Sequence, residues 1–199
     1  DPKKVSENFE RSLPQNPLER THTMRALFHL AYENLKPDSS SATPKSSAAL
    51  QEDRNFLNLL IATTAKGIRA EYSEYSNTSS ETASTRFLNS LPHDPVAQSA
   101  TLDALYKITQ ENLRTSTTDT EREENQKFLQ LLVKTDAQKI RTAYHSYSKE
   151  DPASVTSLFK NGLPNDPERR KLVMDSLFAT TRDELLSPSS PEKREENLT

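Results

Sequence analysis

The most distinctive side-chain spacing in this 199-residue chain belongs to two pairs of tyrosines, each separated by two residues. The first pair is Tyr72 and Tyr75, and the second is Tyr144 and Tyr147, at an offset of 72 residues. Residues three positions apart share one face of a helix, so each pair is expected to form one aromatic surface. Tyrosine is enriched at protein-binding hot spots, but it also packs inside proteins with its hydroxyl near solvent. Both interpretations stay open, and the turn-forming residues that follow each pair favour packing.

An arginine precedes each tyrosine pair at the same distance, Arg69 before the first pair and Arg141 before the second. A recurring guanidinium on a helix surface is suited to an acidic partner, although such residues are more often solvated or paired along their own helix. The candidate protein-binding residues are therefore Tyr72, Tyr75, Arg69, Tyr144, Tyr147 and Arg141.

The residue pattern gives no support to a metal or cofactor site. The chain has four histidines and no cysteine, so thiolate ligands are excluded. No two histidines have the four-residue spacing that puts two imidazole ligands on one helix face. Only two glycines are present, Gly67 and Gly162, which are too few for a phosphate-binding loop. We expect neither a metal nor a cofactor.

No catalytic constellation stands out either. Serine and threonine are concentrated in segments that are expected to be linkers. Carboxylates are numerous, but none is expected on an apolar helix face, where burial would raise its pKa. No acid–base pair recurs. We therefore expect no catalytic residues and a non-enzymatic function.

The charge balance narrows the class of partner. The chain has 26 basic and 29 acidic residues, which is not the basic excess typical of nucleic-acid binding. No apolar run approaches the roughly 20 residues of a membrane span. The partner is expected to be another protein, and the sequence leaves the compartment open between cytoplasmic and secreted.

Two motifs recur along the chain. Leu-Pro, followed by two polar residues and a further proline, begins at Leu13, Leu91 and Leu163. Phe-Leu-x-Leu-Leu occupies 56–60 and again 128–132. These offsets predict repeats of about 72–78 residues. The repeats are expected to span 1–78 and 79–150, with a partial third at 151–199.

Each full repeat is expected to contain a short, a middle and a long helix. The ranges are 2–12, 80–91 and 152–162 for short helices, 17–35, 95–114 and 167–186 for middle helices, and 48–75 and 120–147 for long helices. An Asx residue precedes a proline at five helix starts, which predicts N-caps: Asp1-Pro2, Asn16-Pro17, Asp94-Pro95, Asp151-Pro152 and Asp166-Pro167. Gly162 is expected to form a left-handed cap at the end of the third short helix.

The apolar stripe of each long helix is too wide for a single neighbour. The expected fold is therefore all-α, with tandem three-helix repeats stacked into an elongated array or into chained bundles. Because the linkers after the middle helices are the longer ones, a grouping in the order long–short–middle, at roughly 47–113 and 119–186, stays open as well.

We expect the chain to be a non-enzymatic interaction or scaffold segment of a larger helical-repeat protein. The alternative is a host-interacting repeat region of a secreted pathogen effector or surface adhesin. Glu195-Glu196-Asn197 matches Glu123-Glu124-Asn125 at the start of a long helix, so further repeats are expected beyond the chain. Self-association through the incomplete third repeat is a further expectation.

Overall fold

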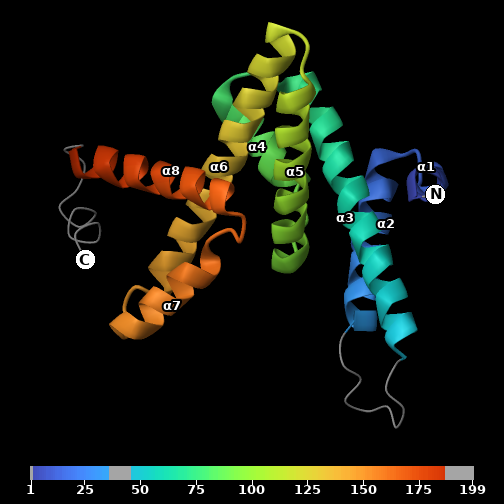
Figure 1. Cartoon of the computed structure of the whole chain (residues 1–199), viewed down its shortest axis with the longest axis horizontal. Coiled ribbons are helices and arrows are strands. Elements are labelled where there is room, and N and C mark those ends of the chain that lie inside the picture. The colour runs from blue at the N-terminus through green and yellow to red at the C-terminus, as the bar shows by residue number, and fades with distance from the viewer. Residues whose placement is uncertain (1, 36–45, 187–199) are drawn as a thin grey trace. The chain divides into compact units, whose positions relative to one another are not determined.

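The computed structural model describes residues 2–35 and 46–186, which form eight α-helices and no strand (Figure 1). The helices are α1 (Pro2–Ser12), α2 (Pro17–Leu35), α3 (Ser47–Tyr75), α4 (Ser80–Ser90), α5 (Pro95–Thr115), α6 (Asp119–Tyr147), α7 (Pro152–Gly162) and α8 (Pro167–Leu186). Each one begins and ends within one residue of the range that the sequence indicates. The all-α fold is confirmed.

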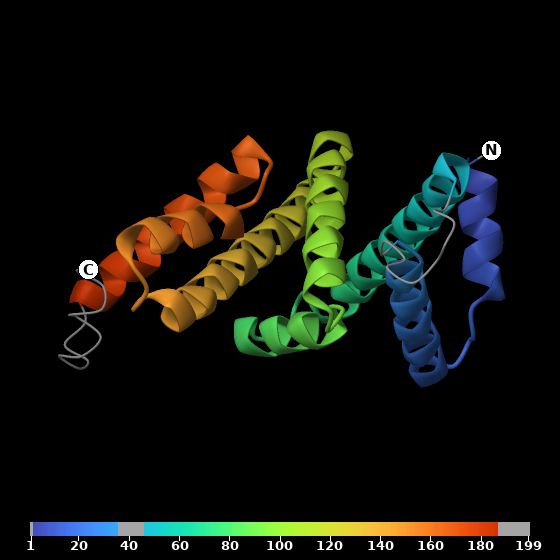
Figure 2. The same cartoon turned by 90° about the horizontal axis from the view of Figure 1, so that it is seen from below.

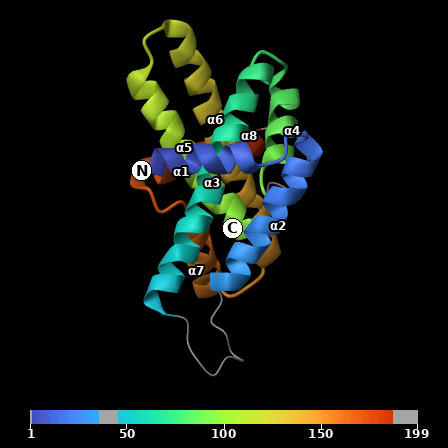
Figure 3. The same cartoon turned by 90° about the vertical axis from the view of Figure 1, so that its right-hand side faces the viewer.

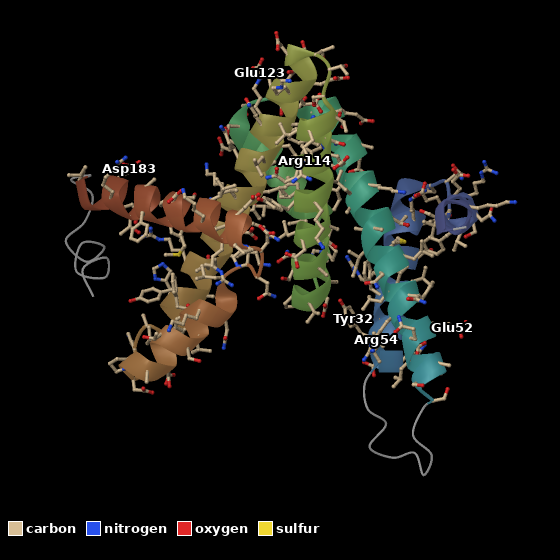
Figure 4. The ribbon with its side chains drawn as sticks, in the orientation of Figure 1. Tyr32, Glu52, Arg54, Arg114, Glu123 and Asp183 are labelled. Atoms are coloured by element: carbon tan, nitrogen blue, oxygen red, sulfur yellow. The ribbon has the colours of Figure 1, made fainter. Side chains whose placement is uncertain are left out.

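The helices form two compact units, residues 1–115 and 116–199. In the first unit α3 is central, since α1, α2, α4 and α5 all pack against it. Figures 1 and 3 show α2 running antiparallel beside the N-terminal half of α3. Figure 4 labels Tyr32 near the end of α2 and Arg54 near the start of α3. The long apolar stripe of α3 is thus shared among several neighbours.

The core of the first unit joins three helices. Phe28 and Ala31 of α2, Leu60 of α3 and Ala97 of α5 are buried in one cluster. The α1 helix adds Phe9, whose ring meets that of Phe56 edge to face at 6.1 Å. Partly buried side chains surround the cluster: Met24, Leu27, Tyr32, Leu57 and Ile61.

In the second unit α6 packs against both α7 and α8 (Figure 2). Val133, Ala137 and Ile140 of α6 form a buried cluster with Val173 of α8. Partly buried apolar side chains from the three helices and from the C-cap of α7 pack around it: Leu129, Phe159, Leu163, Leu172 and Leu177.

Asx residues cap four of the five helix starts that the sequence marks. The Asp94 carboxylate accepts the backbone N–H groups of Val96 and Ala97 at 3.0 and 2.8 Å. Asp151, Asn16 and Asp166 cap α7, α2 and α8 in the same way. The fifth, Asp1, lies outside the described residues. These bonds satisfy N–H groups that have no partner within the helix.

The start of α6 has a capping box that the sequence reasoning did not identify. The Thr118 hydroxyl accepts the Glu121 N–H at 3.2 Å, and the Glu121 carboxylate accepts the Thr118 N–H at 3.3 Å. Hydrogen bonds from the backbone of Thr117 and Thr118 lower the pKa of Glu121. The Thr-x-x-Glu spacing was the available signal.

The expected left-handed cap at Gly162 is wrong. Gly162 is the last residue of α7, and its φ lies outside the left-handed region. The chain leaves the helix at Leu163, which is extended with φ −74° and ψ 147°. Pro164 follows, and the residue before a proline is sterically restricted to extended conformations. Leu91, before Pro92, has nearly the same φ and ψ, −72° and 148°. Proline rather than glycine therefore sets these helix ends.

Candidate functional site

The first tyrosine pair lies inside the first unit. Tyr72 and Tyr75 are 3% and 4% exposed, and their rings meet edge to face at 5.4 Å. The Arg69 guanidinium lies over the Tyr72 ring at 5.6 Å, and Arg86 of α4 lies over the Tyr75 ring at 5.8 Å. Rings covered in this way offer little area to a partner.

Burial is also the main cause of an altered titration at this position. Desolvation raises the pKa of Tyr75 to about 12, and the nearby Glu71 and Tyr72 add to the shift. The Tyr75 hydroxyl is therefore even harder to ionise than that of an exposed tyrosine. Arg69 donates to the Ser73 hydroxyl at 3.3 Å along the same helix.

The second tyrosine pair has the same geometry but is only half-buried. The Tyr144 and Tyr147 rings meet edge to face at 5.7 Å with an interplanar angle of 81°. Desolvation raises the pKa of Tyr147, with a smaller contribution from Tyr144. Arg141 forms an ion pair with Glu184, so its guanidinium connects α6 to α8. We call Arg141, Tyr144 and Tyr147 the tyrosine end of α6.

The short helices explain why the two pairs differ in exposure. The residue at the position of Arg86 is Leu158 in α7, and it is 44% exposed. In α4 both Ala83 and Phe87 are buried, whereas α7 has no buried residue. The tyrosine end of α6 is thus the more accessible of the two equivalent surfaces.

A buried ion pair was missed by the sequence reasoning. Asp136 of α6 and Arg169 of α8 are 7% and 3% exposed, and the Asp136 Oδ2 atom accepts from Arg169 Nη2 at 2.7 Å and Nε at 2.8 Å. The expectation that no carboxylate lies on an apolar face is therefore wrong. The available signal was spacing, because Asp136 follows Leu132 by four residues and precedes Ile140 by four.

Another group that the sequence reasoning did not single out is the set of exposed large apolar side chains. The most exposed aromatic one is Phe178 of α8, at 68%. The others are Val5, Leu30, Leu88, Val96, Leu158 and Leu186. Single exposed apolar residues are common on protein surfaces. Such a residue indicates a binding surface only through its neighbours or through comparison with the residue at the same position in another repeat.

Across residues 2–35 and 46–186, His, Asp and Glu side chains form no group of three that could hold a metal ion. The helices in those same ranges include none with the length and apolar character needed to cross a membrane. The tyrosine end of α6 is therefore the candidate site that this geometry supports best.

Comparison with known proteins gives no assignment. No family model matches the sequence, and no curated protein or solved structure shows significant similarity to it.

Proposed function

We propose that this chain is a non-enzymatic protein-interaction module, a scaffold built from tandem three-helix repeats of about 72–78 residues. The recurring motifs support this arrangement. So do the packing partners, because α3 packs with α4 and α5 just as α6 packs with α7 and α8. Stacked helical repeats present extended surfaces that suit protein partners.

The contact surface that we propose is the tyrosine end of α6. The half-buried, edge-to-face arrangement of Tyr144 and Tyr147 is the observation that carries this proposal. Their rings are held by each other before any partner arrives, so little side-chain entropy is lost on binding. The ion pair with Glu184 holds Arg141 beside them. A rigid aromatic surface beside a guanidinium is the composition that hot spots favour.

Affinity capture with the whole chain tests this proposal. Proteins retained by the wild type are compared with those retained by a Tyr144→Ser/Tyr147→Ser variant. Lys134→Ser is the matched control, because Lys134 is exposed on the same helix about three turns earlier. Circular dichroism confirms that all three chains are helical.

We expect at least one protein to be retained by the wild type and the control but lost from the tyrosine variant. Identical sets of retained proteins for all three chains would exclude the tyrosine end as the contact surface. Titration of a retained partner against purified chain would then give the loss in affinity directly.

A further inference from the structure

The most exposed aromatic side chain occupies a position whose equivalent is buried elsewhere in the chain. Phe178 of α8 corresponds to Phe28 of α2 through the repeat offsets of 78 and 72 residues. Phe28 is 6% exposed, whereas Phe178 is 68% exposed. The same residue type at the same position of a middle helix therefore has opposite environments.

The structure shows what covers this position in α2. Phe28 and Ala31 are buried in one cluster with Leu60 of α3 and Ala97 of α5, and Met24 packs against that cluster. On the α3 side the remaining apolar neighbours are Phe56, Leu57 and Ile61. A long helix that carries the Phe-Leu-x-Leu-Leu motif therefore packs over this position of α2.

The equivalent face of α8 is separate from the face that α8 already uses. Val173 and Leu177 pack toward α6 in the core of the second unit. Phe178 follows Val173 by five residues and so points about 140° away around the helix. It lies between half-buried Met174 and Thr181, the counterparts of Met24 and Ala31 in α2. The α8 helix therefore has a second stripe, defined by Met174, Phe178 and Thr181, beside its buried one.

We propose that the stripe Met174, Phe178 and Thr181 docks an amphipathic helix with the Phe-Leu-x-Leu-Leu pattern, supplied by a protein partner. This inference rests on the repeat relation in the proposed function. A second folded copy of this chain cannot supply such a helix, because both of its Phe-Leu-x-Leu-Leu segments are already packed in its own core. Leu60 and Leu132 are 0% and 1% exposed.

The charged side chains beside the stripe are paired with one another, so we expect the stripe to bind its partner helix mainly through apolar contacts. Lys171 pairs with Asp175 at 2.7 Å, and Arg182 pairs with Asp183 at 3.1 Å. Figure 4 labels Asp183 near the end of α8. Each pair is neutral within itself, so we expect electrostatic attraction to contribute little to binding at the stripe. Binding is expected to depend weakly on salt.

A peptide with the sequence of residues 46–75, which contains the first block, is the probe. It is labelled and titrated with the whole chain, and binding is followed by fluorescence anisotropy at low and high salt. Phe178→Ser is the test variant, and its exposure leaves the fold intact. Leu30→Ser is the matched control, because Leu30 is 54% exposed on α2 and not part of the core cluster. A second peptide carries Phe56→Ser and Leu60→Ser.

We expect the first peptide to bind, with affinity reduced about tenfold or more by Phe178→Ser and unchanged by Leu30→Ser. The substituted peptide is expected not to bind. Absence of binding to the wild type, or binding that Phe178→Ser leaves unchanged, would overturn the inference. So would a chain that dimerises through Phe178 without binding the peptide, as light scattering would show. If the Tyr144→Ser/Tyr147→Ser variant retains the same proteins as the wild type while the peptide still binds, only the contact surface at the tyrosine end of α6 is rejected.

Discussion

The buried ion pair between α6 and α8 provides a quantitative test of how the second unit is held together. The Arg169 and Asp136 side chains are 4% and 9% exposed, and a single carboxylate oxygen receives two guanidinium N–H groups. Replacing Asp136 with threonine leaves a buried guanidinium without that carboxylate. Breaking such a pair by removing one partner costs about 3–5 kcal/mol of unfolding free energy.

The first unit indicates how the cost can be relieved. At the positions of Asp136 and Arg169 it has Thr64 and Ala97, and Ala97 is fully buried. A double variant, Asp136→Thr/Arg169→Ala, therefore removes both charges together. It loses mainly the packing of the arginine stem, about 2 kcal/mol. The double variant is expected to be about 2 kcal/mol more stable than Asp136→Thr alone, so the two single substitutions are not additive.

Urea unfolding followed by circular dichroism at 222 nm measures these free energies. Amide hydrogen exchange of α6 and α8 then locates the lost stability within the second unit. The matched control is Lys171→Ala/Asp175→Ala, an exposed pair on α8 that is expected to change stability by less than about 1 kcal/mol.

Two results would refute the reasoning about this pair. The first is an Asp136→Thr variant within about 0.5 kcal/mol of the wild type, which would mean that the guanidinium finds an equal partner or water. The second is strict additivity: the double variant would then lose as much unfolding free energy as Asp136→Thr and Arg169→Ala lose together, which would mean that the two side chains do not interact energetically.

Two further predictions concern individual residues. Because burial raises the pKa of Tyr75 to about 12, its neutral form stabilises the fold fully below pH 10, and this contribution is lost as pH rises through about 12. Titration of tyrosine ionisation by absorbance at 295 nm is expected to lose its step at the highest pH in the Tyr75→Phe variant. An unchanged titration curve would contradict the assignment of that step to Tyr75. Gly162→Ala is expected to raise the unfolding free energy by about 0.4–1 kcal/mol, because φ is not left-handed and the added Cβ would lie 3.9 Å from Ile140 Cγ1. A lower melting temperature would indicate the left-handed conformation instead.

The sequence by itself determined where the helices lie. Asx residues such as Asp94 and Asp151 satisfy N–H groups within three residues of themselves, and the following prolines fit the first helical turn. Leu-Pro pairs end the short helices for an equally local reason. Such effects act along the chain and need no distant partner, so the predicted ranges agree with the structure within one residue.

Only the tertiary structure decided which side chains are covered. Tyr75 and Tyr147 have the same local pattern, yet one is buried under Arg86 and the other is half-buried. Phe28 and Phe178 differ even more. Burial depends on which residues a second helix brings to that position, and those residues are distant in the sequence. The identity of a residue and its helical face are local properties, whereas its solvent exposure depends on the packing of other helices.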